Sequence, residues 1–409
     1  MFRLSMIALA GAAALSNVHA AEPLDLDGLV RQSIDNHPSI SARLAAVSAA
    51  RSGLDEARQQ YYPTPSIQNL QGSGGSRTSV LALTQPVWTA GRLGATVDGA
   101  AARLRSARIA VRENEVNLGL SVSSAFQSFL QARYRNEALR AYIVRLRAIN
   151  ERMTRRVETG VSAQGELDLL RSRIALAEGQ RKSTEFSESV SVHQLAELVR
   201  LPLAASDLDS TRSILQPPPR EDDVVDRAEN YSPTLQRLTY DIDAARSDAK
   251  AKSADLWPTL ALVAQRNLVH NSPSQISSTT FGLQLQYSPG AGTSAAAASH
   301  AADAQIVAQS ASREASRSDL VTKVHGEFGE YAAAIARRPD LLLNITAADN
   351  VMQSYERLFV GGKRSLLDVM NAAREVSDAE VSLADLDALL TCGRYRLAVY
   401  SAELPWMGR

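Results

Sequence analysis

The sequence predicts a mainly α-helical protein with a small β part, in which both halves of the chain follow the same plan. Aromatic residues make up only 5% of the 409 residues, whereas Ala, Ser, Leu and Arg are abundant. This composition is typical of long helices and not of compact sandwiches or α/β enzymes. Long segments without proline and a repeated order of motifs are the other two observations behind the prediction.

Charge and cysteine content exclude several classes of protein. The chain has 44 basic and 44 acidic side chains, and this balance argues against a nucleic-acid-binding protein. Cys392 is the single cysteine, so an internal disulfide and a Cys-rich metal site are excluded. His325 lacks partners at metal-ligand spacing, and no serine with triad partners is evident. The sequence therefore predicts no enzyme activity, no metal and no cofactor.

Residues 1-20 are predicted to be a signal peptide for export from a bacterial cytoplasm. Arg3 supplies a positive charge, Leu4 to Leu15 form a short apolar stretch, and Val18-His19-Ala20 resembles a cleavage site. A buried N-terminal helix is the alternative interpretation. No later segment offers about 18 consecutive apolar residues.

Two structural repeats are predicted, residues 21-215 and residues 223-405, joined by a Pro-rich linker at 216-222. Motifs recur in the same order in both, which makes chance an unsatisfactory explanation. The matching pairs are His37-Pro38-Ser39-Ile40 with Ser232-Pro233-Thr234-Leu235, Tyr62-Pro63-Thr64 with Trp257-Pro258-Thr259, Gly160 with Gly362, and Leu201-Pro202 with Leu404-Pro405. No helix can run through Pro217-Pro218-Pro219, which marks the boundary.

Each repeat is expected to consist of a helix, a β-hairpin, a long helix, a turn and a helix. The first helix spans 25-60, and the hairpins span 65-87 and 259-287. In the second hairpin, Phe281, Leu283, Leu285 and Tyr287 alternate with Gly282, Gln284 and Gln286. This period of two is typical of a barrel wall between lipid and water, and equally of a half-buried strand in a soluble sheet.

The long helices favour the membrane interpretation of the strands. A helix over 92-157 would be roughly 100 Å long at ~1.5 Å per residue, which is too long for a compact domain. Its counterpart at 295-358 is expected to be less regular because of Gly326, Gly329 and Pro339. Such helices must bury apolar stripes against neighbouring helices.

Four strands cannot close a barrel by themselves, and open edges in a bilayer would leave backbone groups unpaired. Three copies in a ring would supply twelve strands, which lies within the range of membrane barrels. A soluble periplasmic coiled-coil scaffold is the alternative from another class of protein.

The chain resembles the TolC family of outer-membrane channels from about residue 25 to 405. The resemblance rests on the duplication, the run Gln85-Pro86-Val87-Trp88-Thr89-Ala90-Gly91 and the two glycine turns. It implies a homotrimer with a twelve-stranded β-barrel in outer-membrane lipid and a twelve-helix α-barrel in the periplasm. It also implies two partners: a periplasmic adaptor (membrane fusion) protein and an inner-membrane ABC transporter or other pump.

The same resemblance implies that the two glycine turns are periplasmic tips that close the channel. Arg364 would pair with Glu166, and Asp368 would line a constriction; Phe359 and Asn371 occupy positions where the family often has tyrosine and a second acidic residue. A plain helix–turn–helix corner would equally explain these residue types. The residues expected to contact the adaptor are Val157, Gly160, Val161, Val360, Gly361 and Gly362.

The predicted function is export through a tripartite type I secretion system. The run Tyr62-Pro63-Thr64-Pro65 is most similar to the branch that secretes large adhesins. The outer-membrane component of a multidrug efflux pump is the alternative with the same architecture.

Overall fold

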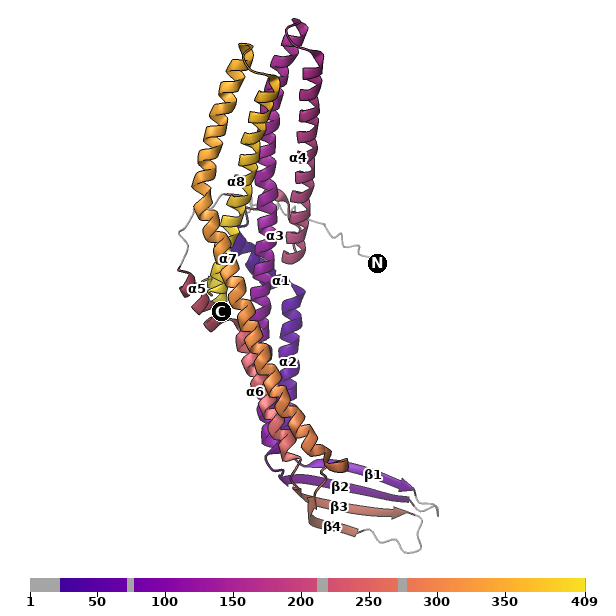
Figure 1. Ribbon diagram of the computed structural model, residues 1–409. Coiled ribbons are helices and arrows are strands. Elements are labelled where there is room, and N and C mark those ends of the chain that lie inside the picture. The colour runs from indigo at the N-terminus through magenta and orange to yellow at the C-terminus, as the bar shows by residue number, and fades with distance from the viewer. Residues whose placement is uncertain (1–22, 72–76, 212–219, 271–277, 409) are drawn as a thin grey trace, which may run out of the picture.

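Long helices form a shaft that carries a sheet at one end and two helical turns at the other (Figure 1). The computed structural model describes residues 23–71, 77–211, 220–270 and 278–408. The predicted signal peptide and Pro217 to Pro219 of the predicted linker lie outside the described residues.

The same order of elements occurs twice along the chain: helix, helix, strand, strand, long helix, helix. The first set is α1 (Leu26–Asn36), α2 (Pro38–Gln59), β1 (Thr64–Gln71), β2 (Arg77–Trp88), α3 (Arg92–Glu158) and α4 (Gln164–Val199). The second set is α5 (Glu221–Tyr231), α6 (Pro233–Ala254), β3 (Thr259–His270), β4 (Ser278–Gln286), α7 (Ser294–Val360) and α8 (Leu366–Tyr400). Three short 3₁₀ turns lie at Ala205–Asp207, Ala291–Thr293 and Pro405–Gly408.

The prediction of one helix over 25-60 is wrong, because the chain breaks between α1 and α2. His37 has extended backbone angles, φ −74° and ψ 129°, and Pro38 starts the next helix. Proline disfavours the helical conformation of the residue before it, yet suits the first turn of a new helix. Ser232 and Pro233 divide α5 from α6 in the same way, and the Ser232 side chain accepts a hydrogen bond from the Leu235 N–H.

The two long helices contain 67 residues each. The residues expected to make the second less regular do not break it, because α7 runs continuously through Gly326, Gly329 and Pro339. Packing on α8 holds the helix at this point. Arg338 donates to the Asp387 carboxylate at 2.8 Å, and Ala334 is buried one turn earlier.

The four strands form one antiparallel sheet in the order β1-β2-β3-β4. Ile67 lies opposite Leu81, and Leu262 lies opposite Leu283. A bulge between Pro86 and Trp88 interrupts the register of β2 and β3. The predicted hairpins are therefore present within a residue or two of their expected ends, and β1 and β4 are the edges of the sheet.

The shaft is a layer of four helices along most of its length. Towards the turns the order is α4-α3-α8-α7, and towards the sheet it is α2-α3-α6-α7 (Figure 1). The core in the upper part includes Leu146, Leu170 and Val369, while Phe129, Leu130 and Leu195 are buried lower down. Trp406 packs against Gly119 of α3, where a β-carbon would lie 3.3 Å from the indole ring and would force the ring to shift.

Candidate functional site

One face of the sheet is apolar and exposed. Residues opposite one another in neighbouring strands share a face, and this face carries Ile67, Leu81, Leu83, Leu262, Phe281, Leu283 and Leu285. All seven are exposed in the single chain, and Phe281 is 77% exposed. Arg266 lies on the same face opposite Leu81, towards the loop end of the sheet. Water is an unfavourable environment for so large an apolar surface.

The opposite face of the sheet is mainly polar, with Val80 and Val263 among its polar side chains. Gln284 and Gln286 of β4 alternate with the apolar residues, and Gln265 and Asn267 of β3 are joined by a hydrogen bond of 2.9 Å. Thr84 of β2 lies opposite Thr64 of β1. One sheet therefore offers an apolar environment on one side and a hydrated environment on the other, which is the pattern of a wall between lipid and water.

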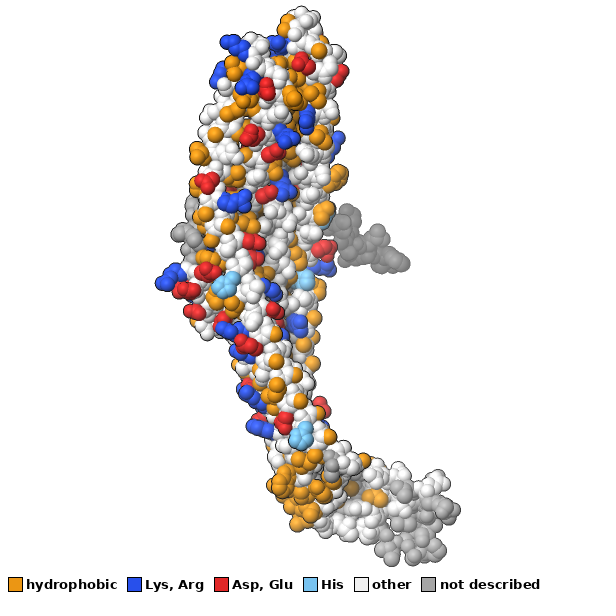
Figure 2. Space-filling view, in the orientation of Figure 1, with side chains coloured by type: hydrophobic (Ala, Val, Ile, Leu, Met, Phe, Trp, Pro, Cys, Tyr) orange, Lys and Arg blue, Asp and Glu red, His pale blue; other side chains and the backbone are white. Residues whose placement is uncertain are grey.

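Exposed aromatic side chains surround the junction between the helices and the sheet. They are Tyr61, Tyr62, Trp88, Trp257 and Tyr287, each next to the end of a strand. Figure 2 shows hydrophobic side chains gathered at this junction. Tyrosine and tryptophan are enriched where a membrane meets water, because one part of the ring system is apolar and the other hydrogen-bonds. Sequence reasoning did not group these five residues, although Tyr62-Pro63 and Trp257-Pro258 recur at matching positions.

The two turns at the other end of the shaft have the same backbone geometry. Gly160 ends α3 with φ +73°, and Gly362 ends α7 with φ +69°. Each glycine lies in the left-handed region that a side chain disfavours, and the following N–H closes the helix by bonding back to a carbonyl. Val161 donates to the Arg156 carbonyl at 2.8 Å, and Lys363 donates to the Leu358 carbonyl at 2.9 Å.

Most residues predicted at the tips are exposed there. Gly160, Val161, Val360, Gly361 and Gly362 form the outermost surface of the two turns. Val157 differs, because it is partly buried against the helix core and is not an exposed tip residue. The exposed valines and glycines present apolar surface at the end of the shaft, next to the exposed Lys363 and Arg364.

Asp368 starts α8 as part of a capping box. Its carboxylate accepts hydrogen bonds from the Ser365 hydroxyl at 2.9 Å and the Ser365 N–H at 3.2 Å. These bonds, together with the charge of Arg364, hold the pKa of Asp368 below its ordinary value. The capping interaction gives this aspartate a structural role whether or not it lines a passage.

Arg364 pairs within the chain differently from the expected arrangement. Its guanidinium lies 3.9 Å from the Asp368 carboxylate and 4.5 Å from the centre of the Tyr355 ring. Within the described residues of a single chain, Arg364 forms no ion pair with Glu166. Glu166 is half-buried in the first turn of α4, and Asn371 is exposed on α8.

Phe359 was expected at the constriction but belongs to the helix core. Its side chain is only 7% exposed, and the Arg156 guanidinium lies 4.9 Å above its ring. An apolar ring at the last-but-one residue of α7 is better satisfied by packing under the turn than by facing water.

Two arginines of α3 connect the tips, and sequence reasoning missed both. Arg152 bonds to the Glu356 carboxylate of α7 at 3.0 Å. One turn later, Arg156 covers Phe359, donates to the Val360 carbonyl at 3.4 Å and donates to the Ser162 hydroxyl at 3.2 Å. Arg152 and Arg156 therefore tie the end of α3 to the end of α7. Their spacing of four on one helix was the available signal, since it places both on one face.

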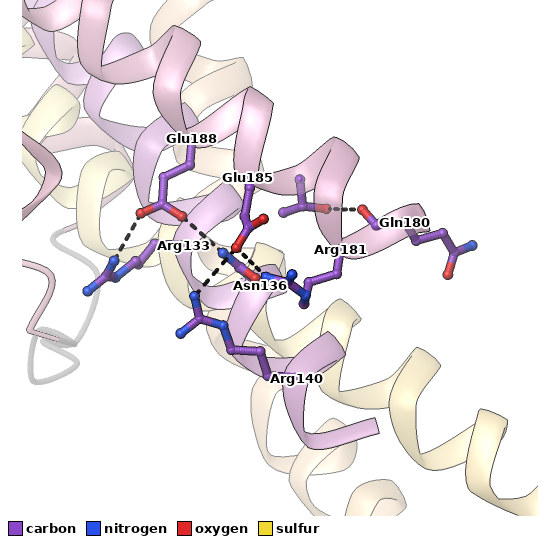
Figure 3. Close-up of polar contacts among 8 residues, drawn as sticks. Arg133, Asn136, Arg140, Gln180, Arg181, Glu185 and Glu188 are labelled. Atoms are coloured by element: carbon purple, nitrogen blue, oxygen red, sulfur yellow. Dashed lines mark hydrogen bonds and ion pairs between the residues drawn. The ribbon is translucent and has the colours of Figure 1, made fainter. Parts of the chain in front are cut away.

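The α3–α4 hairpin is fixed in register by a buried carboxylate (Figure 3). Glu188 of α4 is 10% exposed and bonds to Arg133 at 3.0 Å and to Asn136 at 3.3 Å. Glu185 lies beside Arg181 and 3.7 Å from Arg140. A carboxylate buried between helices requires such partners, so sliding of α4 along α3 would leave it unpaired.

Two features are absent from the described part of the chain. No helix there is both long and apolar enough to cross a membrane. No group of three or more His, Cys, Asp or Glu side chains in those ranges is placed to hold a metal ion.

The helical shaft ends in a sheet with one apolar face, and the exposed tyrosine and tryptophan side chains at the junction form an aromatic border. This combination is characteristic of the outer-membrane channel class of protein. The family model described as "Outer membrane efflux protein" matches residues 29–190 and 224–400. The chain therefore belongs to this family, which includes the TolC-like channels, and the family consists of channels and not of enzymes.

Solved structures share the fold at low sequence identity. The outer-membrane channel OprN is 18% identical with a TM-score of 0.78, covering 93% of this chain and 90% of that one. VceC from Vibrio cholerae is 15% identical with a TM-score of 0.78, covering 92% and 95%. The open state of the Neisseria gonorrhoeae channel MtrE is 17% identical with a TM-score of 0.65, covering 92% and 88%. A comparison with curated proteins gave no match.

Proposed function

We propose that three copies of this chain form an export duct through the outer membrane. The observation that carries the proposal is the four-stranded sheet with an apolar face and two unpaired edges, β1 and β4. In a bilayer each unpaired backbone group costs several kcal/mol, so β4 of one copy must pair with β1 of the next. Three copies of four strands make a twelve-stranded barrel.

The helices support the same assembly. At the edges of the helical layer lie α7 on one side and α4 and α2 on the other. These edges expose large apolar side chains, among them Phe186 of α4 at 75% and Leu343 of α7 at 70%. Joining α7 of one copy to α4 and α2 of the next would bury them and close a twelve-helix tunnel in the periplasm.

The tips are the proposed gate and the proposed adaptor surface. Arg152 and Arg156 would hold α3 and α7 together in the closed state, and Glu166, Arg364, Asp368 and Asn371 would face one another between copies around the entrance. Gly160, Val161, Val360, Gly361 and Gly362 would meet a periplasmic adaptor protein, which joins the duct to an inner-membrane ABC transporter or other pump. The family membership and the exposure of these residues support this proposal.

Replacing Arg152 with alanine tests the gate. The substitution removes the ion pair with Glu356 and should raise single-channel conductance in a planar bilayer, because the α7 tip is then less tightly held. Arg147→Ala is the matched control, since Arg147 pairs with Glu178 on the exposed side of the same helix. Equal conductance in the wild type and both variants would show that Arg152 does not help to hold the gate closed. Arg364→Ala tests the interaction between copies by the same readout.

For the substrate, we propose an unfolded protein secreted by a type I system, with a large adhesin as the class. The Tyr62-Pro63-Thr64-Pro65 run supports this choice, and the family description supports efflux of small molecules as the alternative. Deletion of the protein should abolish surface display of the adhesin and leave drug sensitivity unchanged. Raised drug sensitivity with normal display would show that the efflux alternative is correct.

A further inference from the structure

A groove of about 500 Å³ lies in the shaft between α4 and α8, with α3 as its floor. The groove has an apolar inner surface, because Leu139 and Tyr142 of α3 and Ala177 of α4 are buried there, and Leu176 and Val381 form its sides. The groove is separate from the sheet and from the turns, and its residues belong neither to the proposed gate nor to the proposed adaptor surface.

Three arginines, one from each helix, line the groove: Arg135, Arg173 and Arg374. Arg135 is held by two hydrogen bonds to the Asp385 carboxylate, and Arg374 lies 3.6 Å from Asp378. Arg173 has no ion pair within the described part of the chain. The two aspartates cannot balance three guanidinium groups, so the groove keeps a net positive charge.

Tyr142 adds a hydroxyl donor between these charges. Burial raises the pKa of its phenol, while Arg173 and Arg374 act to lower it and Asp378 acts to raise it. The hydroxyl is therefore protonated at neutral pH and can donate a hydrogen bond. Arg173 of α4, Arg374 of α8 and Tyr142 of α3 therefore line one groove, and both arginines are close enough to act on the charge of the Tyr142 phenol.

We propose that this groove binds an anionic amphiphile, with a carboxylate head group bound by Arg173, Arg374 and Tyr142, and an apolar body on Leu139 and Leu176. A guanidinium matches a carboxylate with two parallel N–H donors, and the bond is stronger where water is partly excluded. The groove volume lies within the range of small-molecule sites, about 300–1,000 Å³. A partner helix, with a diameter of about 10 Å, needs a longer and more open surface.

The test uses 1-pyrenebutyrate and purified protein in lipid nanodiscs, with binding followed by fluorescence anisotropy. We expect saturable binding that weakens about tenfold in Arg173→Ala, because the charge-assisted contact of this guanidinium with the head group is lost. Arg374→Ala should weaken binding less, since this arginine is shared with Asp378. Arg171→Ala is the matched control, because Arg171 is on the same helix but pairs with Asp168 outside the groove.

The uncharged analogue 1-pyrenebutanol separates the head group from the apolar body. It should bind the wild type and Arg173→Ala equally, and more weakly than pyrenebutyrate binds the wild type. Equal pyrenebutyrate affinity in the wild type and Arg173→Ala would overturn the proposal, as would equal affinity for the two probes. Absence of binding to the assembled protein would also overturn it, because a neighbouring copy would then cover the groove. None of these results depends on whether the protein transports anything.

Discussion

The start of α8 shows how one side chain can serve both folding and the tip. The Ser365 hydroxyl accepts a hydrogen bond from the Asp368 N–H at 3.2 Å and donates one to its carboxylate at 2.9 Å. The folded state lowers the pKa of Asp368 from its ordinary value, mainly through the Ser365 bonds. This carboxylate therefore stabilises the turn above its unfolded pKa, about 3.9, and the stabilisation is lost as pH falls through the lowered value.

We predict that Ser365→Ala destabilises the α8 N-terminus by about 1 kcal/mol at pH 7. In the wild type, protection of the first-turn amides should be constant between pH 7 and pH 5 and should fall below about pH 4. Hydrogen exchange of α8 amides measures both effects. Unchanged protection in Ser365→Ala at pH 7 would show that the cap does not hold the turn.

Glu188 provides the second residue-level prediction. Glu188→Ala should destabilise the protein by about 1–3 kcal/mol, because Arg133 and the buried Asn136 amide lose their shared acceptor. Glu178→Ala, which removes an exposed pair with Arg147, should cost less than about 1 kcal/mol. Thermal unfolding followed by circular dichroism distinguishes them. Similar melting temperatures for the two variants would contradict a register role for Glu188.

The sequence alone located the two glycine turns at the tips, but it did not predict the side-chain contacts around them. Gly160 and Gly362 were predictable because each ends a long helical segment and only glycine adopts the left-handed backbone easily. The contact between Arg152 and Glu356 was not predictable, since it joins residues that are 204 positions apart. Phe359 was placed by analogy at the constriction, and its burial depends on the helices that surround it.

At the level of elements, strand alternation was read correctly because its period of two is independent of the rest of the fold. The helix break at His37-Pro38 was missed, although Pro38 is part of a motif that identified the repeat. Proline also disfavours the helical conformation of the residue before it, which was the available signal. The aromatic border was missed for another reason. Tyr61, Trp88 and Tyr287 are scattered along the sequence, and only the sheet brings the ends of the strands together.

The apolar face of the sheet carries the element-level prediction. Leu283→Arg should greatly reduce the amount of protein recovered in the outer-membrane fraction, because an arginine facing lipid near the middle of the bilayer costs about 2–4 kcal/mol. Gln284→Arg, one residue away on the polar face, should insert normally. Immunoblots of separated membrane fractions provide the measurement. The opposite result, with Leu283→Arg inserted and Gln284→Arg lost, would reverse the assignment of the two faces.

At the scale of the whole molecule, a single rotation between neighbouring copies would pair both the free strand edges and the free sides of the helical layer. The free edges of β1 and β4 and the free sides of α7, α4 and α2 lie on corresponding sides of the layer, so one rotation would pair them all. The division into repeats at 21-215 and 223-405 stays a prediction; the two matches of the family model, one in each part, support it.

The mass of the assembled protein tests the central claim most directly. The purified protein should be monodisperse only in detergent or lipid, and native mass spectrometry should give three times the mass of the mature chain. Crosslinks between cysteines placed on β1 and β4 should join different copies. A stable single chain that stays in solution without detergent would contradict the account, because its sheet edges and its apolar face would then need no partner.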